Sequence, residues 1–374
     1  MNTPFSGISR AVSSNPLALP LRERRAGAAL LRRQKARIAA CATEQFLERN
    51  PDWTLRFGDA AATKGREDAA YHVDFLAGAL ETGEPEAFVG YVAWLIDVLG
   101  ARGIDPHAIA ESLTLVGREA SQVLDGSTRE LLQGIMDSGI ARTMGAPVHA
   151  AGSGEQGDGS PLASAATTFL HALLLGERQA ALGIAREALR IAPQPTDVYV
   201  DVFQRSLEEI GRRWQLNRIT VAQEHMATAI VQFVLAQLYS SLVRSGPSRG
   251  VALVTGVEGE LHQVGANLVA DALEMDGWRV RFLGTNVPHE GIVEAMAEMK
   301  AGMIAISATM LFNVEPVARL VESVRGITGS AQPRILVGGG AFRNAPRLWC
   351  DIGADASALD VRGACAAARG DATR

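Results

Sequence analysis

The sequence predicts an α plus α/β chain, in which an all-helical amino-terminal part precedes a doubly wound parallel sheet. Residues 28–145 and 162–245 show apolar residues at spacings of three and four, which is typical of amphipathic helices. Residues 250–370 instead alternate short apolar strands with helical stretches, the order found in a parallel sheet covered by helices. The expected segments are a disordered tail (1–27), a helical domain (28–145), a flexible linker (146–161), a four-helix bundle (162–245) and the sheet domain (250–370).

Composition excludes several classes of protein. With 47% hydrophobic and 21% charged residues, the chain has the make-up of a water-soluble globular protein. The net charge of −5 implies no broad basic surface, so nucleic acid is an unlikely partner. Cys41, Cys350 and Cys365 show neither metal-ligand spacing nor a disulfide framework. With no secretory signal and no apolar run of about 20 residues, the sequence predicts a cytoplasmic protein without a membrane partner.

The helical domain contains one group of residues suited to a ligand. Helices are expected at 28–49, 64–82, 85–102, 106–123 and 128–142, in a loosely globin-like layout. Tyr71 and His72 share one turn of an apolar helix, and Trp94 lies on the next helix. Together they could form an aromatic pocket for a planar tetrapyrrole. The alternative is that these side chains are core residues of a small bundle.

In the bundle, helices are expected at 162–174, 177–191, 196–215 and 220–243. Trp214 lies near the end of one helix, and after nine residues Glu224 and His225 follow in the first turn of the next. This spacing allows all three to face one ligand. Alternatively, the tryptophan belongs to the core, and the Glu-His pair is an exposed complement to the helix dipole.

The sheet domain opens with the stretch that carries the clearest chemistry. An apolar strand from Val251 leads into Glu260-x-His262-x-x-Gly265 at the start of a helix. Loops that leave parallel strands lie at the carboxyl edge of a sheet, where ligands bind. Neutral imidazole ligates late transition metals, and a nearby carboxylate fixes its tautomer. Gly265, which lacks a Cβ, allows close approach of a large flat ligand. A solvated loop histidine is the alternative.

Three further strands are expected at 279–284, 303–310 and 334–340. Ser307 and Thr309 lie at the end of one of them, and Gly338 and Gly339 at the end of another. Because these ends meet at the same edge of the sheet, we expect a deep slot there, lined by hydroxyl groups and bare backbone.

The stretch 250–370 resembles cobalamin-binding domains, which have a Rossmann-like or flavodoxin-like fold. Their pattern of Asp-x-His-x-x-Gly, Ser-x-Leu or Ser-x-Thr, and Gly-Gly is matched by Glu260, His262 and Gly265, by Ser307 and Thr309, and by Gly338 and Gly339. The resemblance implies that His262 is the lower axial ligand of cobalt and that the displaced nucleotide tail inserts beside the serine and glycine strands. Glutamate in place of aspartate is a departure that keeps the carboxylate.

The Trp214, Glu224 and His225 spacing resembles that of adenosylcobalamin-dependent photoreceptors. The resemblance implies that the tryptophan and the glutamate hold the adenosyl group, and that visible light breaks the cobalt–carbon bond. Those proteins have a histidine where this chain has Gln215, so capture of cobalt at that position is excluded here. A helical domain in place of a DNA-binding module resembles photocobilins, which add biliverdin, for which Tyr71, His72 and Trp94 are the candidates.

The sequence therefore predicts a light-sensing signalling protein rather than an enzyme. It would bind adenosylcobalamin, with biliverdin as a possible second chromophore. It would form a homo-oligomer that changes with light, and it would act on an unknown downstream protein. Two alternatives stay open: a corrinoid carrier that shuttles a methyl group between methyltransferases, and a haem-type sensor that uses His72.

Overall fold

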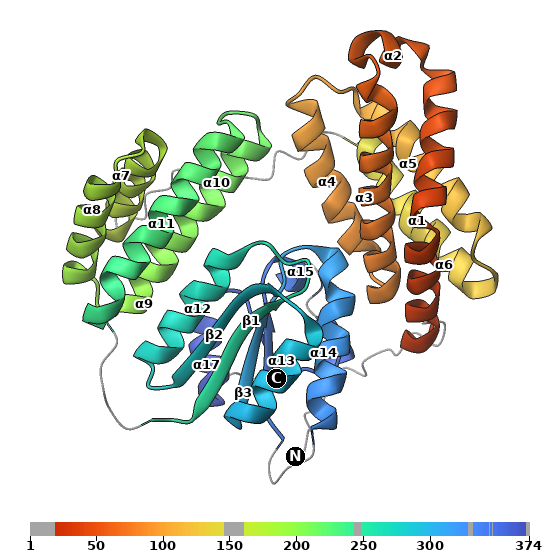
Figure 1. The fold of residues 1–374 in the computed structure, drawn as a ribbon. Helices are drawn as coiled ribbons and strands as arrows, with labels where there is room; N and C mark the ends of the chain where they lie inside the picture. The colour runs from red at the N-terminus through yellow and green to blue at the C-terminus, as the bar shows by residue number, and fades with distance from the viewer. Residues whose placement is uncertain are drawn as a thin grey trace, which may run out of the picture.

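In the computed structural model, the structure describes residues 19–145, 161–242, 248–327, 332–343, 345 and 347–371. The predicted linker at 146–161 lies outside these residues except for Pro161, as does most of the predicted tail. Three parts follow one another along the chain: a helical domain, a helical bundle and a sheet domain (Figure 1). In the described part of the chain, no helix has the length and apolar content needed to cross a bilayer.

The helical domain consists of α1 to α6. α1 packs along α3, α4 lies against α6, and α5 lies against α1 and α6. α1 begins at Leu21, so the prediction that the tail is disordered as far as residue 27 is wrong for its last residues. The bounds are α1 Leu21–Arg49, α2 Pro51–Phe57, α3 Ala60–Thr82, α4 Pro85–Gly100, α5 Pro106–Gln122 and α6 Gly126–Met144.

The helical bundle runs from α7 to α11. Its third helical run contains one π-helical segment between α9 and α10. The last helix begins with a capping box, in which the Gln223 side chain accepts from the backbone N–H of Thr220 at 2.9 Å and the Thr220 hydroxyl accepts from the backbone N–H of Gln223 at 3.2 Å. The bounds are α7 Pro161–Leu175, α8 Arg178–Ile191, α9 Pro195–Val198, the π-helix Tyr199–Gln204, α10 Arg205–Gln215 and α11 Val221–Leu242.

The sheet domain confirms the predicted fold class. Its five strands are all parallel, in the order β2-β1-β3-β4-β5. The short fifth strand was not predicted. The strands are β1 Val251–Val257, β2 Arg279–Val287, β3 Met303–Ser307, β4 Arg334–Gly338 and β5 Ala356–Ala358. The helices are α12 Gln263–Met275, α13 His289–Met299, α14 Val314–Gly326, α15 Gly340–Arg343, α16 Leu348–Asp351 and α17 Val361–Arg369, with a 3₁₀ turn at Leu311–Asn313.

Alternate strand residues feed two separate cores, as the period of two requires. Leu253 of β1 and Ile304 of β3 face α13 and α14, and this core continues into the helical domain. Ala252 of β1 and Ala305 of β3 face α12 and α17, and this second core continues into the bundle. The sheet therefore carries the helical domain on one face and the bundle on the other, and the carboxyl ends of its strands open between them.

Candidate functional site

The loop that follows β1 positions the candidate site. The order of the strands in the sheet reverses at β1, because β2 pairs with one side of β1 and β3 pairs with the other. Ligands of open α/β sheets bind outside the strand ends at such a switch point. Glu260 and His262 lie in this loop, and α12 begins directly after His262. The sequence therefore brings an imidazole to the position on the sheet edge where a ligand is expected.

Glu260 is completely buried and is the centre of a hydrogen-bond network. One carboxylate oxygen, Oε1, accepts from the backbone N–H of His262 at 2.8 Å and pairs with its ring Nδ1 at 2.7 Å. The other oxygen, Oε2, accepts from the backbone N–H of Thr309 at 2.5 Å and from the side-chain amide of Asn313 at 3.0 Å. Four donors from two loops thus converge on a single carboxylate.

These contacts decide the protonation of the pair. Burial alone would raise the pKa of Glu260, but the hydrogen bonds from His262 and Thr309 outweigh it and lower that pKa below its ordinary value. The bond to Glu260 raises the pKa of His262. Because an ionised carboxylate only accepts, it holds the proton on Nδ1. Nε2 is left to bind a metal, and the imidazole side chain is 56% exposed.

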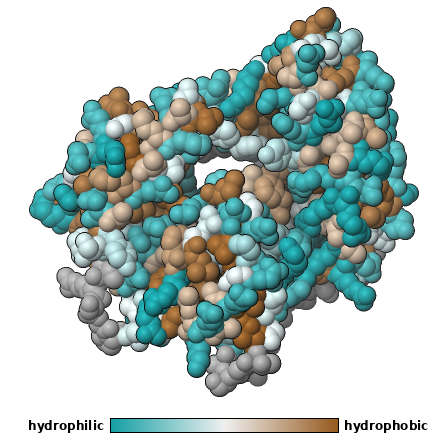
Figure 2. Space-filling model, viewed as in Figure 1, coloured by the Kyte–Doolittle hydropathy of each residue, from teal (hydrophilic) through white to brown (hydrophobic). Residues whose placement is uncertain are grey.

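His262 opens into a cavity of about 680 Å³ that all three parts of the chain line. Its walls include Tyr71, His72 and Trp94 of the helical domain, Trp214 of the bundle and Thr309 of the sheet domain. Figure 2 shows an opening between the bundle and the helical domain, above the end of the sheet where α15 begins in Figure 1. Residues predicted for two separate tetrapyrroles, namely Tyr71, His72 and Trp94 for one and Trp214 and Thr309 for the other, therefore line a single cavity together with His262.

A second, smaller cavity of about 110 Å³ lies between the sheet and helices α12 and α17. It brings together four predicted residues: Gly265, Ser307, Gly338 and Gly339. Its other walls are mainly apolar side chains, so the prediction of a slot lined by hydroxyls is wrong in that respect. Thr309 faces the larger cavity instead, because the chain turns after β3 and directs its N–H to Glu260.

The glycines at this edge differ in what they do. A Cβ on Gly339, whose φ is +99°, would lie 2.4 Å from the carbonyl oxygen of Ala308, so no side chain is possible there. A Cβ on Gly338 would lie 2.7 Å from the carbonyl oxygen of Ala358. A Cβ on Gly265 would meet no described atom within 4 Å. Gly338 and Gly339 are therefore required by packing, whereas Gly265 leaves space free beside the smaller cavity.

Two bundle residues lie apart from the others. His225 pairs with Glu224 across 2.5 Å, but neither lines the larger cavity, and the His225 side chain is mostly exposed. The negative charge of Glu224 nevertheless contributes to the raised pKa of His262, so the first turn of α11 lies within electrostatic reach of the site. Trp214 does line the cavity, and the guanidinium of Arg102 lies 5.5 Å from the centre of its ring.

His72 has the environment of a core residue. Its side chain is 3% exposed, its Nδ1 lies 2.7 Å from the Tyr91 hydroxyl, and burial lowers its pKa to about 4. Gln215 is also engaged, because its side chain donates to Asp97 of α4 at 3.3 Å.

Sequence reasoning missed Asn313 and the segment Met310–Phe312, which reach the site from the loop after β3. The signal available was the polar Asn313 in an otherwise apolar run.

Comparison with known proteins identifies the ligand class. Two models described as "B12 binding domain" match residues 250–369 and 165–239. The dimethylamine corrinoid protein of Methanosarcina barkeri is 27% identical over 47% of this chain and 83% of its own length. Trimethylamine corrinoid protein 1 of Methanosarcina acetivorans is 28% identical over 50% and 88%. The monomethylamine corrinoid protein structure of M. barkeri aligns at 22% identity and a TM-score of 0.49, covering 55% of this chain and 97% of its own.

These relatives correct the functional prediction. They are named as corrinoid proteins of methylamines, so the prediction of a light-sensing protein that belongs with the adenosylcobalamin photoreceptors is wrong. The predicted light-dependent change of oligomeric state depended on that interpretation and has no support from these relatives. The Trp-x9-Glu-His spacing led to this wrong prediction because spacing along two helices does not determine where the side chains point.

The residues present fit a corrinoid. His262 presents a free imidazole nitrogen to a large cavity, and Gly265 leaves open space beside a second one. Among the described residues, no cluster of three or more His, Cys, Asp or Glu could hold a metal ion without such a macrocycle. With two B12-binding domain matches at 165–239 and 250–369, this chain is a cobalamin-binding protein.

Proposed function

We propose that the chain is a corrinoid carrier of methyl groups in a methyltransferase system, and not itself an enzyme. The observation that carries this proposal is the Glu260–His262 pair at the sheet edge, within a B12-binding domain whose curated relatives are methylamine corrinoid proteins. A bound corrinoid supplies a cobalt ion that accepts and releases a methyl group. We propose that the group carried on a bound corrinoid is methyl rather than adenosyl.

The protein side of this function would be to hold the cobalt through His262 and to fix the direction and tautomer of that imidazole. His262 would ligate through Nε2, because Glu260 engages Nδ1. Thr309 and Asn313 fix the other carboxylate oxygen, so Glu260 cannot follow a turn of the imidazole without breaking its contacts to a second loop. Partners that orient a metal-binding histidine change metal affinity by about 10- to 100-fold. The network thus gives the cobalt a ligand of fixed direction and fixed tautomer.

The smaller cavity, with Ser307, Gly338 and Gly339 in its wall, would hold the nucleotide tail of a bound cobalamin. At about 110 Å³ it lies below the roughly 300 Å³ at which ligand pockets begin. We therefore propose that the helices lining it, α12 and α17, separate from the sheet edge when the corrinoid binds. The partner would be a methyltransferase, as in the methanol:cobalamin methyltransferase complex of M. barkeri, a structure that also aligns with this chain.

The test loads the full chain with methylcobalamin in the dark and adds a cobalamin-dependent methyltransferase with a thiol acceptor. A carrier loses the methylcobalamin spectrum only when both are present. His262→Ala, with its fold verified by circular dichroism, is expected to lose it at least 10-fold more slowly. Retention of the methyl group on the wild-type protein with every methyltransferase offered, despite normal cobalamin binding, would contradict the carrier function.

A further inference from the structure

The helices α1 to α6 lie outside both regions that match B12-binding domains, yet two of them reach the His262 cavity. α3 contributes Tyr71 and Phe75, and α4 contributes Tyr91 and Trp94. Tyr71 is 56% exposed, which is unusual for an aromatic side chain in the wall of a concave cavity. Phe75 and Tyr91 are buried, so Tyr71 and Trp94 are the rings that the wall presents. Aromatic side chains in the wall of a concave cavity are typical of ligand sites.

This wall is held firmly against the loop that follows β3. The rings of Phe75 and Phe312 meet edge to face, with their centroids 5.5 Å apart. α3 approaches the same loop so closely that a Cβ on Gly78 would lie 2.9 Å from the carbonyl oxygen of Leu311. Leu311 and Phe312 follow Thr309, whose N–H binds Glu260. The aromatic wall and the cobalt-loop network are therefore joined through one short loop.

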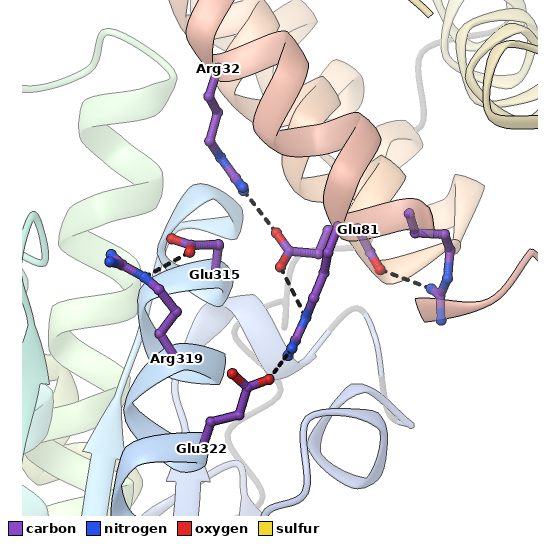
Figure 3. Close-up of polar contacts among 7 residues, drawn as sticks. Arg32, Glu81, Glu315, Arg319 and Glu322 are labelled. Atoms are coloured by element: carbon purple, nitrogen blue, oxygen red, sulfur yellow. Dashed lines mark hydrogen bonds and ion pairs between the residues drawn. The ribbon is translucent and has the colours of Figure 1, made fainter. Parts of the chain in front are cut away.

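Ion pairs fix the carboxyl-terminal end of α3. Glu81 is buried and receives a hydrogen bond from Arg32 of α1 at 2.9 Å (Figure 3). Arg25 of α1 lies between Glu81 and Glu322 of α14, and pairs with both. These ion pairs, which run from α1 to α3 and from α1 to α14, thus connect the helical domain to the sheet domain on the side facing away from the bundle. These contacts keep Tyr71 and Trp94 beside His262 rather than leaving the domain free on its linker.

The aromatic rings of this wall stack on one another. The ring of Phe75 stacks on Tyr91 at 3.7 Å between centroids, and that of Tyr91 lies 6.0 Å from Trp94. His72, the titratable ring behind them, is occupied by Tyr91 and stays neutral. Beside Asp68, whose pKa burial raises, the helical domain therefore offers the cavity mainly stacked rings.

We infer that the helical domain forms the third wall of the corrinoid site, with Tyr71 and Trp94 in contact with the corrinoid held by His262. The inference rests on the proposed function only in taking the ligand to be a corrinoid. It assigns the aromatic residues to the same tetrapyrrole as the cobalt loop, and it gives the domain outside the B12-binding matches a direct part in binding.

The test titrates the full chain with hydroxocobalamin and follows the absorbance of the bound form. Loss of two aromatic contacts in Tyr71→Ser/Trp94→Leu is expected to weaken binding about 10-fold. The matched control is Leu55→Ser/Trp53→Leu on α2, far from the cavity, where Leu55 is 85% exposed. This control should change the dissociation constant less than about twofold.

Hydrogen–deuterium exchange of the wild-type chain gives a measurement that does not depend on folding of the variants. Hydroxocobalamin should slow exchange in α3 and α4 at the cavity but leave α2 unchanged. The inference is overturned if α3 and α4 exchange as before and the double variant binds as tightly as the wild type. It is also overturned if biliverdin binds at the same time as hydroxocobalamin, and if Tyr71→Ser/Trp94→Leu weakens the binding of biliverdin but not that of hydroxocobalamin. In each of these cases weaker binding by His262→Ala would leave the proposed function standing, whereas no binding by the wild type would refute that function.

Discussion

Replacing Glu260 with glutamine is the sharpest test of the network behind His262. The substitution keeps the shape of the side chain but exchanges one acceptor oxygen for an NH2 group, which can only donate. The carboxylate now serves four donors, two on each oxygen. In the variant the new NH2 group must face one of the two pairs of donors. That pair is either the backbone N–H and Nδ1 of His262, or the N–H of Thr309 with the amide of Asn313.

The cost follows from the burial of this side chain. A buried donor without an acceptor costs about 1–3 kcal/mol, so two of them cost roughly 2–6 kcal/mol of stability in the sheet domain. If the amide turns its oxygen toward Thr309 and Asn313, Nδ1 of His262 loses its acceptor and the imidazole loses its fixed tautomer. Cobalt affinity should then fall by about 10- to 100-fold, the usual effect of losing such a partner.

The assay measures both quantities on the same preparation. Hydroxocobalamin titration gives the dissociation constant, and thermal unfolding without the ligand gives the loss of stability. Glu258→Gln is the control, because this exposed carboxylate lies two residues earlier on the same turn. Equal unfolding temperatures and equal affinities for Glu260→Gln and the control would refute the role assigned to the network.

Two further outcomes are expected. Burial raises the pKa of Asp271 from 3.8 to about 6, although the Tyr199 hydroxyl donates to it at 3.1 Å. This group stabilises the fold fully below pH 3.8, and the contribution is lost as pH rises through 6. At pH 7.5 Asp271→Asn should therefore be more stable than the wild type by up to about 3 kcal/mol, at about 1.4 kcal/mol per pKa unit, and should unfold at a higher temperature. The difference should vanish by pH 4. Equal unfolding curves at both pH values would contradict the raised pKa. Gly339→Ala should lose several kcal/mol, about 1–3 from backbone strain alone, because its methyl group meets the carbonyl of Ala308; denaturant unfolding measures this, and Gly326→Ala, with open space around it, is the control.

The sheet and the cobalt loop could be predicted because their signals are local. Apolar runs of strand length, separated by helical stretches, specify a parallel sheet without knowledge of distant contacts. Glu260 and His262 are two residues apart, so their pairing follows from the loop that joins β1 to α12. β5 was missed because Ala356–Ala358 is too short and too weakly apolar to stand out.

The start of α1 shows how tertiary contacts override local signals. Gly27 disfavours a helix by about 1 kcal/mol relative to alanine, and a mixed Arg-rich segment precedes it. In the structure Gly27 is buried where α1 crosses α3, and a Cβ there would lie 3.2 Å from Leu80 and 2.4 Å from Thr128. The residue that argues against a helix in the sequence is thus one that allows close helix packing in the fold.

The shared cavity could not have been predicted, because it depends on how three parts of the chain meet. Tyr71 and His262 are separated by 190 residues of sequence, and no periodicity relates them. Trp214 shows the same limit. Its spacing to Glu224 suggested a common ligand, whereas the structure directs Trp214 into the cavity and Glu224 only toward its border.

The arrangement also determines how a methyltransferase would reach the cobalt. A site enclosed by the sheet, the bundle and the helical domain admits another protein only if one wall moves. The helical domain shares an apolar core with the sheet, whereas it meets the bundle, among the described residues, through hydrogen bonds and the approach of Arg102 to the Trp214 ring. Arg102 donates to the carbonyl of Gln215 at 3.2 Å, and Gln215 donates to Asp97 at 3.3 Å. Partly exposed hydrogen bonds of this kind contribute only about 0.5–1.5 kcal/mol each, so the contact between the bundle and the helical domain should open first, while each stays on the sheet through its own apolar core.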